Sequence, residues 1–207
     1  MIISDLKLLY PWPAERPALE FDPEGWCHPE VEAAIRTIAR PGAAVLMELG
    51  SWLGKSARVM LDHAPAATVI CIDHWRGSPE HQPGGKAESD KLPILYDQFI
   101  RNMWDYRGRV IPVRETTLEG MKIVAHCGLR PEAIYIDASH DRESLYADIQ
   151  GATSLFPGVP LVGDDWAFPS VKLAVWQAER EGLLVEIPYR QHGQFWWGCT
   201  KEEPCAS

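Results

Sequence analysis

Three carboxylates that follow apolar segments of the chain could together bind a cation. Asp137 follows the segment EAIYI, and the adjacent residues Asp164 and Asp165 follow VPLVG. Neighbouring carboxylates near a low-dielectric core repel one another, which raises one pKa unless a cation balances the charge. Oxygen ligands without a cysteine beside them favour Mg²⁺ over Zn²⁺. The alternatives are a helix cap at Asp137 and a solvated turn at the aspartate pair.

A histidine close to the first of these carboxylates is a candidate general base. His140 lies three residues after Asp137. Its imidazole titrates near neutrality and can accept the proton of a substrate hydroxyl. Metal coordination would lower the pKa of that hydroxyl. A structural or exposed histidine is the alternative, and Asp141 is either a substitute base or the N-cap of the next helix.

The segment ELGSWLGKS could bind the amino-acid part of a ligand. Gly50 and Gly54 allow a tight turn and a close approach of the backbone. Ser56 and the amides of the first helical turn can bind an anionic group, while Glu48 would attract an amine and repel phosphates. The spacing GxxxGKS is one residue short of a P-loop, and GxGxxG is absent. A plain glycine turn is the alternative.

Asp73 ends the next apolar segment, ATVICID, and could accept hydrogen bonds from ribose hydroxyls. An aspartate at this position is also a common turn residue, so alone it indicates little. Combined with an amino-acid-binding turn at Gly50, it describes a ligand that is half amino acid and half nucleoside. S-Adenosylmethionine has this composition.

The elements that must position these residues alternate between strand and helix. Strands are expected at 43–49, 67–73, 109–115, 132–137 and 159–165. The first of these segments is a continuous apolar run, as is typical of a strand buried on both faces. Helical spacing of apolar residues occurs within 28–40, 50–64, 92–106, 118–128, 142–156 and 171–182. The segments 183–190 and 194–201, joined by a glycine-bearing turn, would close the chain as an antiparallel pair. We therefore expect a Rossmann-like α/β fold with a mostly parallel seven-stranded sheet, helices on both faces, and ligands at the carboxyl ends of the strands.

The whole chain, residues 1–207, is expected to form one domain. Residues 1–27 are proline-rich and would form an irregular N-terminal arm or lid, and residues 74–90 would form a polar loop on the substrate side. This loop, with Trp75 and His81, and the arm around Trp12 and Trp26 would line the acceptor pocket. Ordinary packing of these aromatic side chains is the alternative.

The sequence VLMELGSWLGKSA resembles the first motif of class I S-adenosylmethionine-dependent methyltransferases. Its E-x-G-x-x-x-G-x-S form is similar to that of the metal-dependent catechol-type O-methyltransferases and of the macrocin and mycinamicin sugar O-methyltransferases. The segments EGWCHPEVEAAI, IDHW, IDASH and GDDW add to the match. The resemblance spans residues 25–200 as an architecture and is specific only at these short motifs.

The resemblance implies a class I methyltransferase fold and S-adenosylmethionine as the cofactor. Glu115 and Thr116, after the third strand, match the adenine-binding region only loosely. The residues expected to bind the cofactor are Glu48, Gly50, Ser51, Gly54, Ser56, Asp73, Trp75, Glu115, Thr116 and Asp137.

The resemblance also implies a metal site at Asp137, Asp164 and Asp165. These families bind the cation with an aspartate after the fourth strand and with an acid–amide or acidic pair after the fifth. The last ligand is Asn in the catechol type, whereas Asp165 stands here, as in the sugar type. The base is Lys in the catechol type and His in the sugar type, which supports His140 as the base.

These inferences predict an O-methyltransferase that uses S-adenosylmethionine and Mg²⁺ or another hard divalent cation. It would methylate a hydroxyl of a small molecule, either a sugar or a phenolic natural product, and would act mainly by positioning the two substrates. A metal-independent small-molecule methyltransferase, or one with a nitrogen acceptor, is the nearest alternative. An NAD-dependent Rossmann oxidoreductase and a non-catalytic binding module are more distant, because ELGSWLG lacks the expected phosphate-binding turn and the set of site residues is complete.

The composition of the chain argues for some classes of partner and cellular environment and against others. Of 207 residues, 46% are hydrophobic, and the net charge of −9 comes without a basic run, which argues against nucleic-acid binding. The five cysteines are scattered without a CxxC pair, as expected of reduced thiols in a cytoplasmic protein. We find no signal-peptide pattern and no apolar stretch long enough to span a membrane. The terminal strands and aromatic side chains would suit a homodimer interface.

Overall fold

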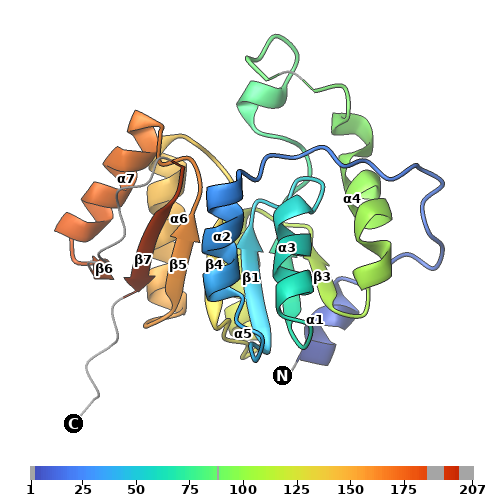
Figure 1. Cartoon of the computed structure of the whole chain (residues 1–207), viewed down its shortest axis with the longest axis horizontal. Coiled ribbons are helices and arrows are strands. Elements are labelled where there is room, and N and C mark those ends of the chain that lie inside the picture. The colour runs from blue at the N-terminus through green and yellow to red at the C-terminus, as the bar shows by residue number, and fades with distance from the viewer. Residues whose placement is uncertain (1–2, 88, 186–193, 201–207) are drawn as a thin grey trace.

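A seven-stranded sheet forms the centre of the computed structural model, which describes residues 3–87, 89–185 and 194–200 (Figure 1). The strand order is β3-β2-β1-β4-β5-β7-β6. The strands are β1 Val45–Leu49, β2 Thr68–Ile72, β3 Val110–Val113, β4 Ala133–Ile136, β5 Pro160–Gly163, β6 Leu184–Val185 and β7 Trp196–Thr200. The first five strands are parallel, and β7 is antiparallel to both of its neighbours. The predicted Rossmann-like sheet is confirmed.

Helices cover both faces of this sheet (Figure 1). The α-helices are α1 Ile3–Leu9, α2 Pro29–Ile38, α3 Lys55–His63, α4 Leu95–Met103, α5 Thr117–His126, α6 Arg142–Leu155 and α7 Pro169–Arg180. Short 3₁₀ helices span η1 Pro79–His81, η2 Leu92–Ile94 and η3 Trp104–Tyr106. The helix predicted over 92–106 is therefore an α-helix with a 3₁₀ turn at each end.

Two apolar cores lie on opposite faces of the sheet, because successive strand residues point to opposite sides. In β1, Met47 and Leu49 belong to the core shared with α1, α5, α6 and α7. Leu46, the residue before Met47, belongs to the core shared with α2, α3 and α4. Apart from the first residue of some strands, every residue of β1 to β5 is buried. Burial on both faces of the sheet explains why these segments of the sequence are apolar.

Residues 1–27 were expected to be irregular, and this expectation is wrong for Ile3–Leu9, which form α1. Leu6 of this helix is fully buried in the core beside α5, with Ile3 and Tyr10 packed around it. Lys7 donates a hydrogen bond to the carbonyl of Gly108 over 2.8 Å. The prolines begin only after Tyr10, so the proline-rich character of the whole segment concealed a short amphipathic helix at its start.

The antiparallel end of the sheet contains β6 and β7, shorter than the predicted segments 183–190 and 194–201. The glycine-bearing turn expected between them lies outside the described residues. Gly163 at the end of β5 faces the indole of Trp196 on β7, and a Cβ atom there would lie 2.0 Å from that ring. Of the helices described, none is long and apolar enough to cross a membrane.

Candidate active site

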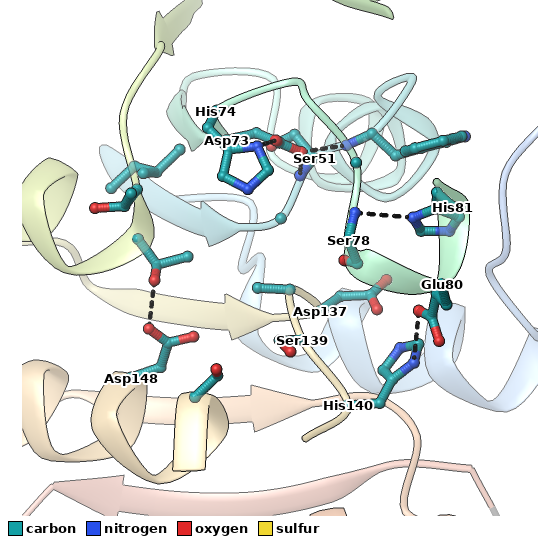
Figure 2. A pocket seen from close by; sticks show the side chains of 18 of the residues that line it. Ser51, Asp73, His74, Ser78, Glu80, His81, Asp137, Ser139, His140 and Asp148 are labelled. Atoms are coloured by element: carbon teal, nitrogen blue, oxygen red, sulfur yellow. Dashed lines mark hydrogen bonds and ion pairs between the residues drawn. The ribbon is translucent and has the colours of Figure 1, made fainter. Parts of the chain in front are cut away.

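A cavity of about 370 Å³ lies at the carboxyl ends of the parallel strands (Figure 2). Its walls come from the segments after β1, β2, β3 and β4, together with part of the N-terminal arm and the 77–81 loop. The volume lies in the range of about 300–1,000 Å³ that is typical of small-molecule sites. Of the residues predicted to bind a cofactor, those that line it are Gly50, Ser51, Ser56, Asp73, Glu115, Thr116 and Asp137.

The glycine turn between β1 and α3 lies directly against the end of β4. Gly50 has a φ of +83°, and a Cβ atom at this position would lie 2.1 Å from the carbonyl oxygen of Asp137. Only glycine therefore allows this approach of the two strand ends. Trp52, in the same turn, has a φ of +44°, a left-handed conformation that is strained for a residue with a side chain. Such strain is common at ligand-binding sites.

Asp73 holds this turn from the end of β2. Its carboxylate accepts hydrogen bonds from the backbone N–H groups of Ser51 and Trp52, both over 3.0 Å, and from that of Trp75 over 2.6 Å. A carboxylate can accept about four hydrogen bonds. Asp73 also lines the cavity, so it retains the capacity to accept a ribose hydroxyl.

Glu48 lies beneath the turn rather than in the cavity wall. Its side chain is fully buried and accepts a hydrogen bond from the Ser56 hydroxyl over 2.6 Å. Burial raises the pKa of this carboxyl from 4.5 to about 7. Among the described residues, its second oxygen has no hydrogen-bond partner, and neither has the buried hydroxyl of Ser51. A ligand with an ammonium group would supply a donor to this unsatisfied pair.

Two tryptophans expected at the site lie elsewhere. Trp75 is 2% exposed and belongs to the core beside α4, where its indole N–H donates to the Trp52 carbonyl over 2.8 Å. Trp12 donates to the carbonyl of Val110 at the start of β3, the end of the sheet opposite to the cavity. Both side chains therefore stabilise the fold. Only Trp75 also affects the site, because its indole holds the glycine turn that contains Trp52. Gly54 also lies outside the cavity wall and caps α3.

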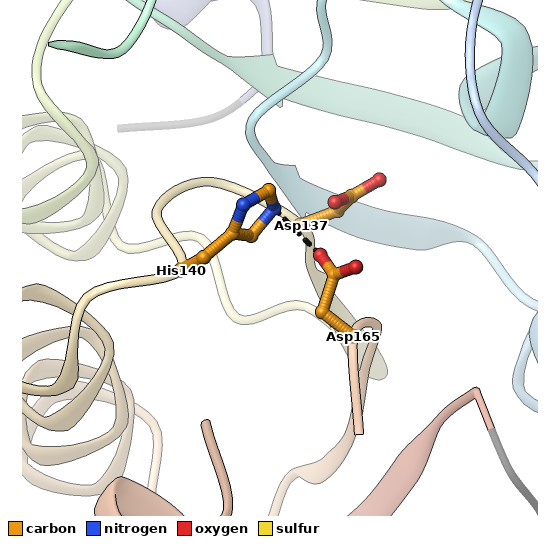
Figure 3. A group of neighbouring side chains, drawn as sticks. All are labelled: Asp137, His140 and Asp165. Carbon is orange, nitrogen blue, oxygen red and sulfur yellow. Dashed lines mark ion pairs between the residues drawn. The ribbon is translucent and has the colours of Figure 1, made fainter. Parts of the chain in front are cut away.

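Three possible metal ligands, Asp137, His140 and Asp165, lie together at one end of the cavity (Figure 3). Asp137 and His140 line the cavity itself, and Asp165 lines a small adjoining pocket. One ligand atom from each lies within 4.8 Å of the others. His140 Nε2 lies 2.6 Å from an oxygen of Asp165, and Nδ1 lies 3.2 Å from an oxygen of Glu80. The hydrogen bond to Asp165 raises the pKa of His140 to about 9. Asp165 has a φ of +62°, which turns its side chain toward this group.

Asp164 points to a different partner from Asp165. It accepts a hydrogen bond from the Tyr135 hydroxyl over 3.0 Å, and the same hydroxyl lies 3.3 Å from Asp137. Burial raises the pKa values of Asp137 and Asp164, and repulsion from neighbouring carboxylates, Asp164 and Asp165 for Asp137 and Asp165 for Asp164, acts in the same direction. Among the described residues, the group of potential ligands therefore includes His140 in place of the predicted Asp164. The second candidate base, Asp141, caps α6 by accepting from the backbone N–H of Ser144 over 2.9 Å.

The mouth of the cavity is formed by aromatic rings from three segments. The rings of Trp52 and His81 lie 4.6 Å apart, and Trp26 lies 5.7 Å from Trp52 and 6.0 Å from His81. Trp26 is 61% exposed, at the end of the N-terminal arm. All three line the cavity, as expected for Trp26 and His81.

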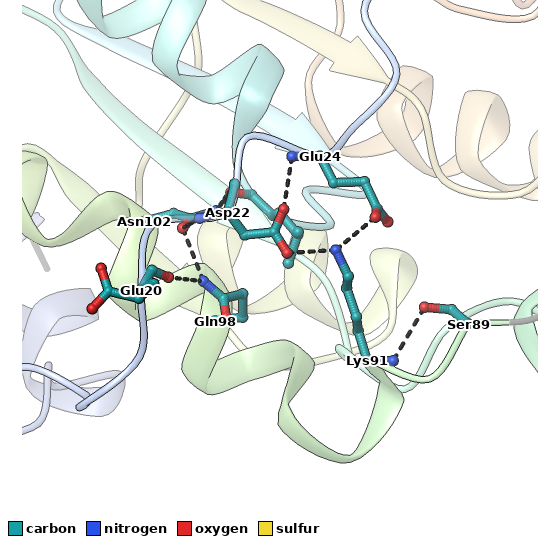
Figure 4. Close-up of polar contacts among 8 residues, drawn as sticks. Glu20, Asp22, Glu24, Ser89, Lys91, Gln98 and Asn102 are labelled. Atoms are coloured by element: carbon teal, nitrogen blue, oxygen red, sulfur yellow. Dashed lines mark hydrogen bonds and ion pairs between the residues drawn. The ribbon is translucent and has the colours of Figure 1, made fainter.

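The N-terminal arm is fixed along α4 by polar side chains (Figure 4). Gln98 donates to the carbonyl of Glu20 over 2.8 Å, and Asn102 exchanges two hydrogen bonds with the backbone of Asp22. Both α4 side chains are buried. The arm therefore follows a defined path toward the cavity, although it has no regular structure in this part.

A salt bridge joins this arm to the loop that covers the other side of the mouth. Lys91 forms ion pairs with Asp22 and with Glu24, the latter over 2.6 Å (Figure 4). Lys55, at the start of α3, donates to the carbonyl of Gly25 over 2.7 Å. We call the group Asp22, Glu24 and Lys91 the arm latch.

Several lining residues were missed by the sequence analysis, among them Glu80 and Asp148. Glu80 could not be found, because no pattern in the polar loop indicates which side chain reaches His140. Asp148 carries a signal: it lies on the same helical face as Leu145, Ile149 and Ala152, which are all buried. An acidic residue on an apolar helical face requires a specific partner.

A comparison with protein families identifies the class of the protein. A family model described as "Methyltransferase domain" matches residues 47–166, more than half of the chain, so the chain belongs to this family. The matched segment starts in β1 and ends just after the aspartate pair.

Solved structures of the same fold agree with this family. The O-methyltransferase from Bacillus cereus in complex with SAH has 15% identity over 90% of this chain and 84% of its own, with a TM-score of 0.60. The O-methyltransferase TomG from Streptomyces achromogenes, involved in tomaymycin synthesis, has 12% identity over 84% and 81%, with a TM-score of 0.58. Fibrillarin from Methanococcus jannaschii, a pre-rRNA processing protein, has 15% identity over 88% and 78%, with a TM-score of 0.57.

Family and fold together make this chain a class I S-adenosylmethionine-dependent methyltransferase. The fold alone does not select the acceptor, because it is shared by a protein of natural-product synthesis and by one of pre-rRNA processing. The acceptor must be argued from the side chains of the cavity.

Proposed function

We propose that the protein is an O-methyltransferase that moves the methyl group of S-adenosylmethionine to a hydroxyl of a small molecule, with the help of a divalent cation. The observation that carries this proposal is the combination of two groups around one cavity. The glycine turn and Asp73 line it, as do Asp137 and His140, and Asp165 lies beside these two in a small adjoining pocket.

The cofactor would lie across the glycine turn. Ser51 and Ser56 would face its amino-acid part, and Glu48 beneath them would compensate the charge of its ammonium group. Asp73 would accept the ribose hydroxyls. This placement is supported by the buried second oxygen of Glu48, which accepts no well-formed hydrogen bond from the described residues and could accept one from an ammonium group.

The cation would be held by Asp137 and Asp165, with Asp164 linked to Asp137 through the Tyr135 hydroxyl. The raised pKa values of Asp137 and Asp164 support such a site, because buried neighbouring carboxylates are stabilised by a positive charge. When bound, the cation would supply Lewis acidity to the acceptor hydroxyl.

His140 is our candidate for the general base that takes the proton of the acceptor hydroxyl. Its Nε2 atom pairs with Asp165, and its Nδ1 atom lies 3.2 Å from an oxygen of Glu80 without a hydrogen bond among the described residues. A protonated imidazole cannot accept a proton, so this role requires that the Asp165 carboxylate be occupied by another partner. The proposed cation would be that partner.

The acceptor would enter through the mouth formed by Trp26, Trp52 and His81. These rings suit a small molecule with a flat apolar face, either a phenol or a sugar. A net charge of −9 without a basic run does not favour a nucleic-acid acceptor.

Methyl transfer from radiolabelled S-adenosylmethionine to panels of phenols and sugars tests the proposal, in the presence of Mg²⁺ or Mn²⁺ and again with EDTA. We expect transfer to at least one panel and its loss with EDTA. Asp137→Asn should lower turnover by about 100-fold or more, while calorimetry still detects binding of SAH. Turnover that is unchanged in EDTA would show a metal-independent methyltransferase.

A further inference from the structure

Asp148 of α6 is a buried acid that neither the fold nor the proposed methyl transfer explains. Its side chain is 3% exposed, yet it lines the cavity (Figure 2). Its Oδ1 atom accepts a hydrogen bond from the Thr117 hydroxyl over 2.5 Å. Within the described part of the chain, this hydroxyl is its single hydrogen-bond partner, and no lysine, arginine or histidine forms an ion pair with it.

The second oxygen of Asp148 is open to the cavity. Among the described residues this oxygen has no hydrogen-bond partner. It is not one of the fully buried polar atoms that lack a partner, so it retains some exposed surface. A contact between α5 and α6 would need only the oxygen that faces Thr117. The free oxygen is therefore available to a ligand, and a buried carboxyl favours a donor that occupies it.

The position of Asp148 in the cavity indicates which part of a ligand it meets. Thr117 is the first residue of α5, and Gly120 in the next turn of this helix lies against Ile72 at the end of β2. In the sheet, β1 separates β2 from β4, the strand that Asp137 follows. In Figure 2 Asp148 and His140 lie on opposite sides of the cavity, with Asp73 above them.

A cofactor with its methyl group near His140 and its ribose at Asp73 would extend its base toward Asp148. The base of S-adenosylmethionine is adenine, whose exocyclic amino group donates two hydrogen bonds. A carboxyl oxygen accepts such a bond. A 6-oxo purine presents an acceptor at the same place, and two acceptors repel one another.

We propose that Asp148 recognises the 6-amino group of the purine base and that Thr117 orients its carboxyl for this contact. The proposal rests on the proposed use of S-adenosylmethionine. It makes Asp148 a specificity-determining residue, because the contact distinguishes adenine from a 6-oxo purine. Burial raises the pKa of Asp148 to about 7, and an N–H donor would favour its ionised form.

Calorimetric titration of three ligands tests the proposal: SAH, its 6-oxo analogue with hypoxanthine in place of adenine, and its N6,N6-dimethyl analogue. The wild-type protein should bind SAH at least about ten-fold more tightly than either analogue. In Asp148→Asn, the preference for SAH over the 6-oxo analogue should fall to within about three-fold, because an amide can accept from an amino group or donate to an oxo group. Thr117→Val should weaken SAH binding without abolishing the preference.

Asp62→Asn is the matched control, because it makes the same substitution at another acid that accepts a hydrogen bond from a hydroxyl, that of Tyr106, but lies outside the cavity wall. This variant should keep the wild-type preference. Equal wild-type affinities for the three ligands, or an unchanged preference in Asp148→Asn, would overturn the role of Asp148 and leave the proposed methyl transfer intact. If the wild-type protein binds SAH at no concentration, the proposed function fails, and the role of Asp148 fails with it.

Discussion

Asp164 and Asp165 are adjacent in the sequence but contact different partners, because the backbone of Asp165 has a left-handed conformation. Asp165 has a φ of +62° and faces His140, while Asp164 faces Tyr135. The Tyr135 hydroxyl thus holds two carboxylates from neighbouring strands in one arrangement before any cation arrives. Such hydrogen bonds commonly tune metal affinity.

Tyr135→Phe should therefore weaken binding of Mn²⁺ or Mg²⁺ by about ten-fold or more. The substitution removes only a hydroxyl, so the core should remain packed. Calorimetric titration with the metal alone measures the effect. Tyr146→Phe, which removes the surface contact to Glu181, is the control and should bind metal like the wild type. Equal affinities in the three proteins would exclude a positioning role for Tyr135.

Glu48→Gln should make the free protein more stable at alkaline pH. Because burial raises the pKa of Glu48 to about 7, the folded state holds this proton more tightly than the unfolded state, whose pKa is near 4.5. This stabilisation is complete below about pH 4.5 and is lost as the pH rises through about 7. Glutamine does not ionise, so its advantage should grow to about 1–3 kcal/mol at pH 8.

Urea unfolding of both proteins between pH 4.5 and 8 measures this difference. Binding of SAH should be weaker in the variant, because its ammonium group would lose a charged partner. A difference in unfolding free energy that does not change with pH would contradict the buried, unpaired state of Glu48.

Single residues were predictable where chemistry and strand position coincide, as for Gly50, Asp73 and Asp137. Each follows an apolar run directly, and all three line the cavity. Trp75 was not predictable, because its φ of +49° turns the indole into the core. A side-chain direction set by an unusual backbone angle leaves no periodic pattern in the sequence.

At the level of elements, the arm and the 74–90 loop depend on each other at the cavity mouth. The arm latch connects the arm by ion pairs to Lys91, the residue that directly follows this loop, and its three side chains are partly exposed. Ion pairs of this kind contribute little to global stability. They can still decide how often the mouth opens.

Lys91→Ala should change the free energy of unfolding by less than about 1 kcal/mol but should expose the arm to proteases. Limited proteolysis followed by mass spectrometry should find faster cleavage within residues 13–25. Lys122→Ala removes an ion pair between neighbours on α5 and is the matched control, with wild-type cleavage expected. Identical digestion of all three proteins would show that the latch does not hold the arm.

Element boundaries were less predictable than the elements themselves. The apolar run 159–165 contains a strand that ends at Gly163, because the last residues turn into the site. Helix α1 was missed because prolines after Tyr10 dominate the composition of the segment. Both errors arise where one stretch of sequence contains two kinds of structure. One stretch is a strand followed by residues of the site, and the other is a helix followed by a proline-rich segment.

For the whole molecule, the cavity lies where both cores meet at one edge of the sheet. A ligand that binds there contacts elements from each face, so its binding should stabilise the entire domain. At 100 times its dissociation constant, a ligand adds about 2.7 kcal/mol. For a chain of this length, we expect SAH to raise the melting temperature by about 5–11 °C.

Differential scanning fluorimetry with SAH, and with NAD as the matched comparison, measures this shift. NAD should leave the melting temperature unchanged, because the turn lacks a phosphate-binding pattern and has Glu48 beneath it. A shift with NAD and none with SAH would favour an oxidoreductase.

The topology of the first five strands followed from the alternation of strands and helices, because such alternation leads to right-handed parallel crossovers. The position of β7 did not follow. Its placement between β5 and β6 depends on the fit of Trp196 over Gly163, a contact between residues more than thirty positions apart. Sequence periodicity is local and does not contain such pairings.

The position of β7 inside the sheet also determines the order in which the two sides of the site can form during translation. β7 is the last of the described strands to leave the ribosome, yet it covers the outer edge of β5. Trp166, next to Asp165, donates its backbone N–H to Gln194 just before β7. The glycine turn and Asp73 can therefore form early in translation, whereas the segment that carries Asp165 gains its contact with Gln194 only when β7 arrives. A nascent chain would complete the Asp73 side of the site before the Asp165 side.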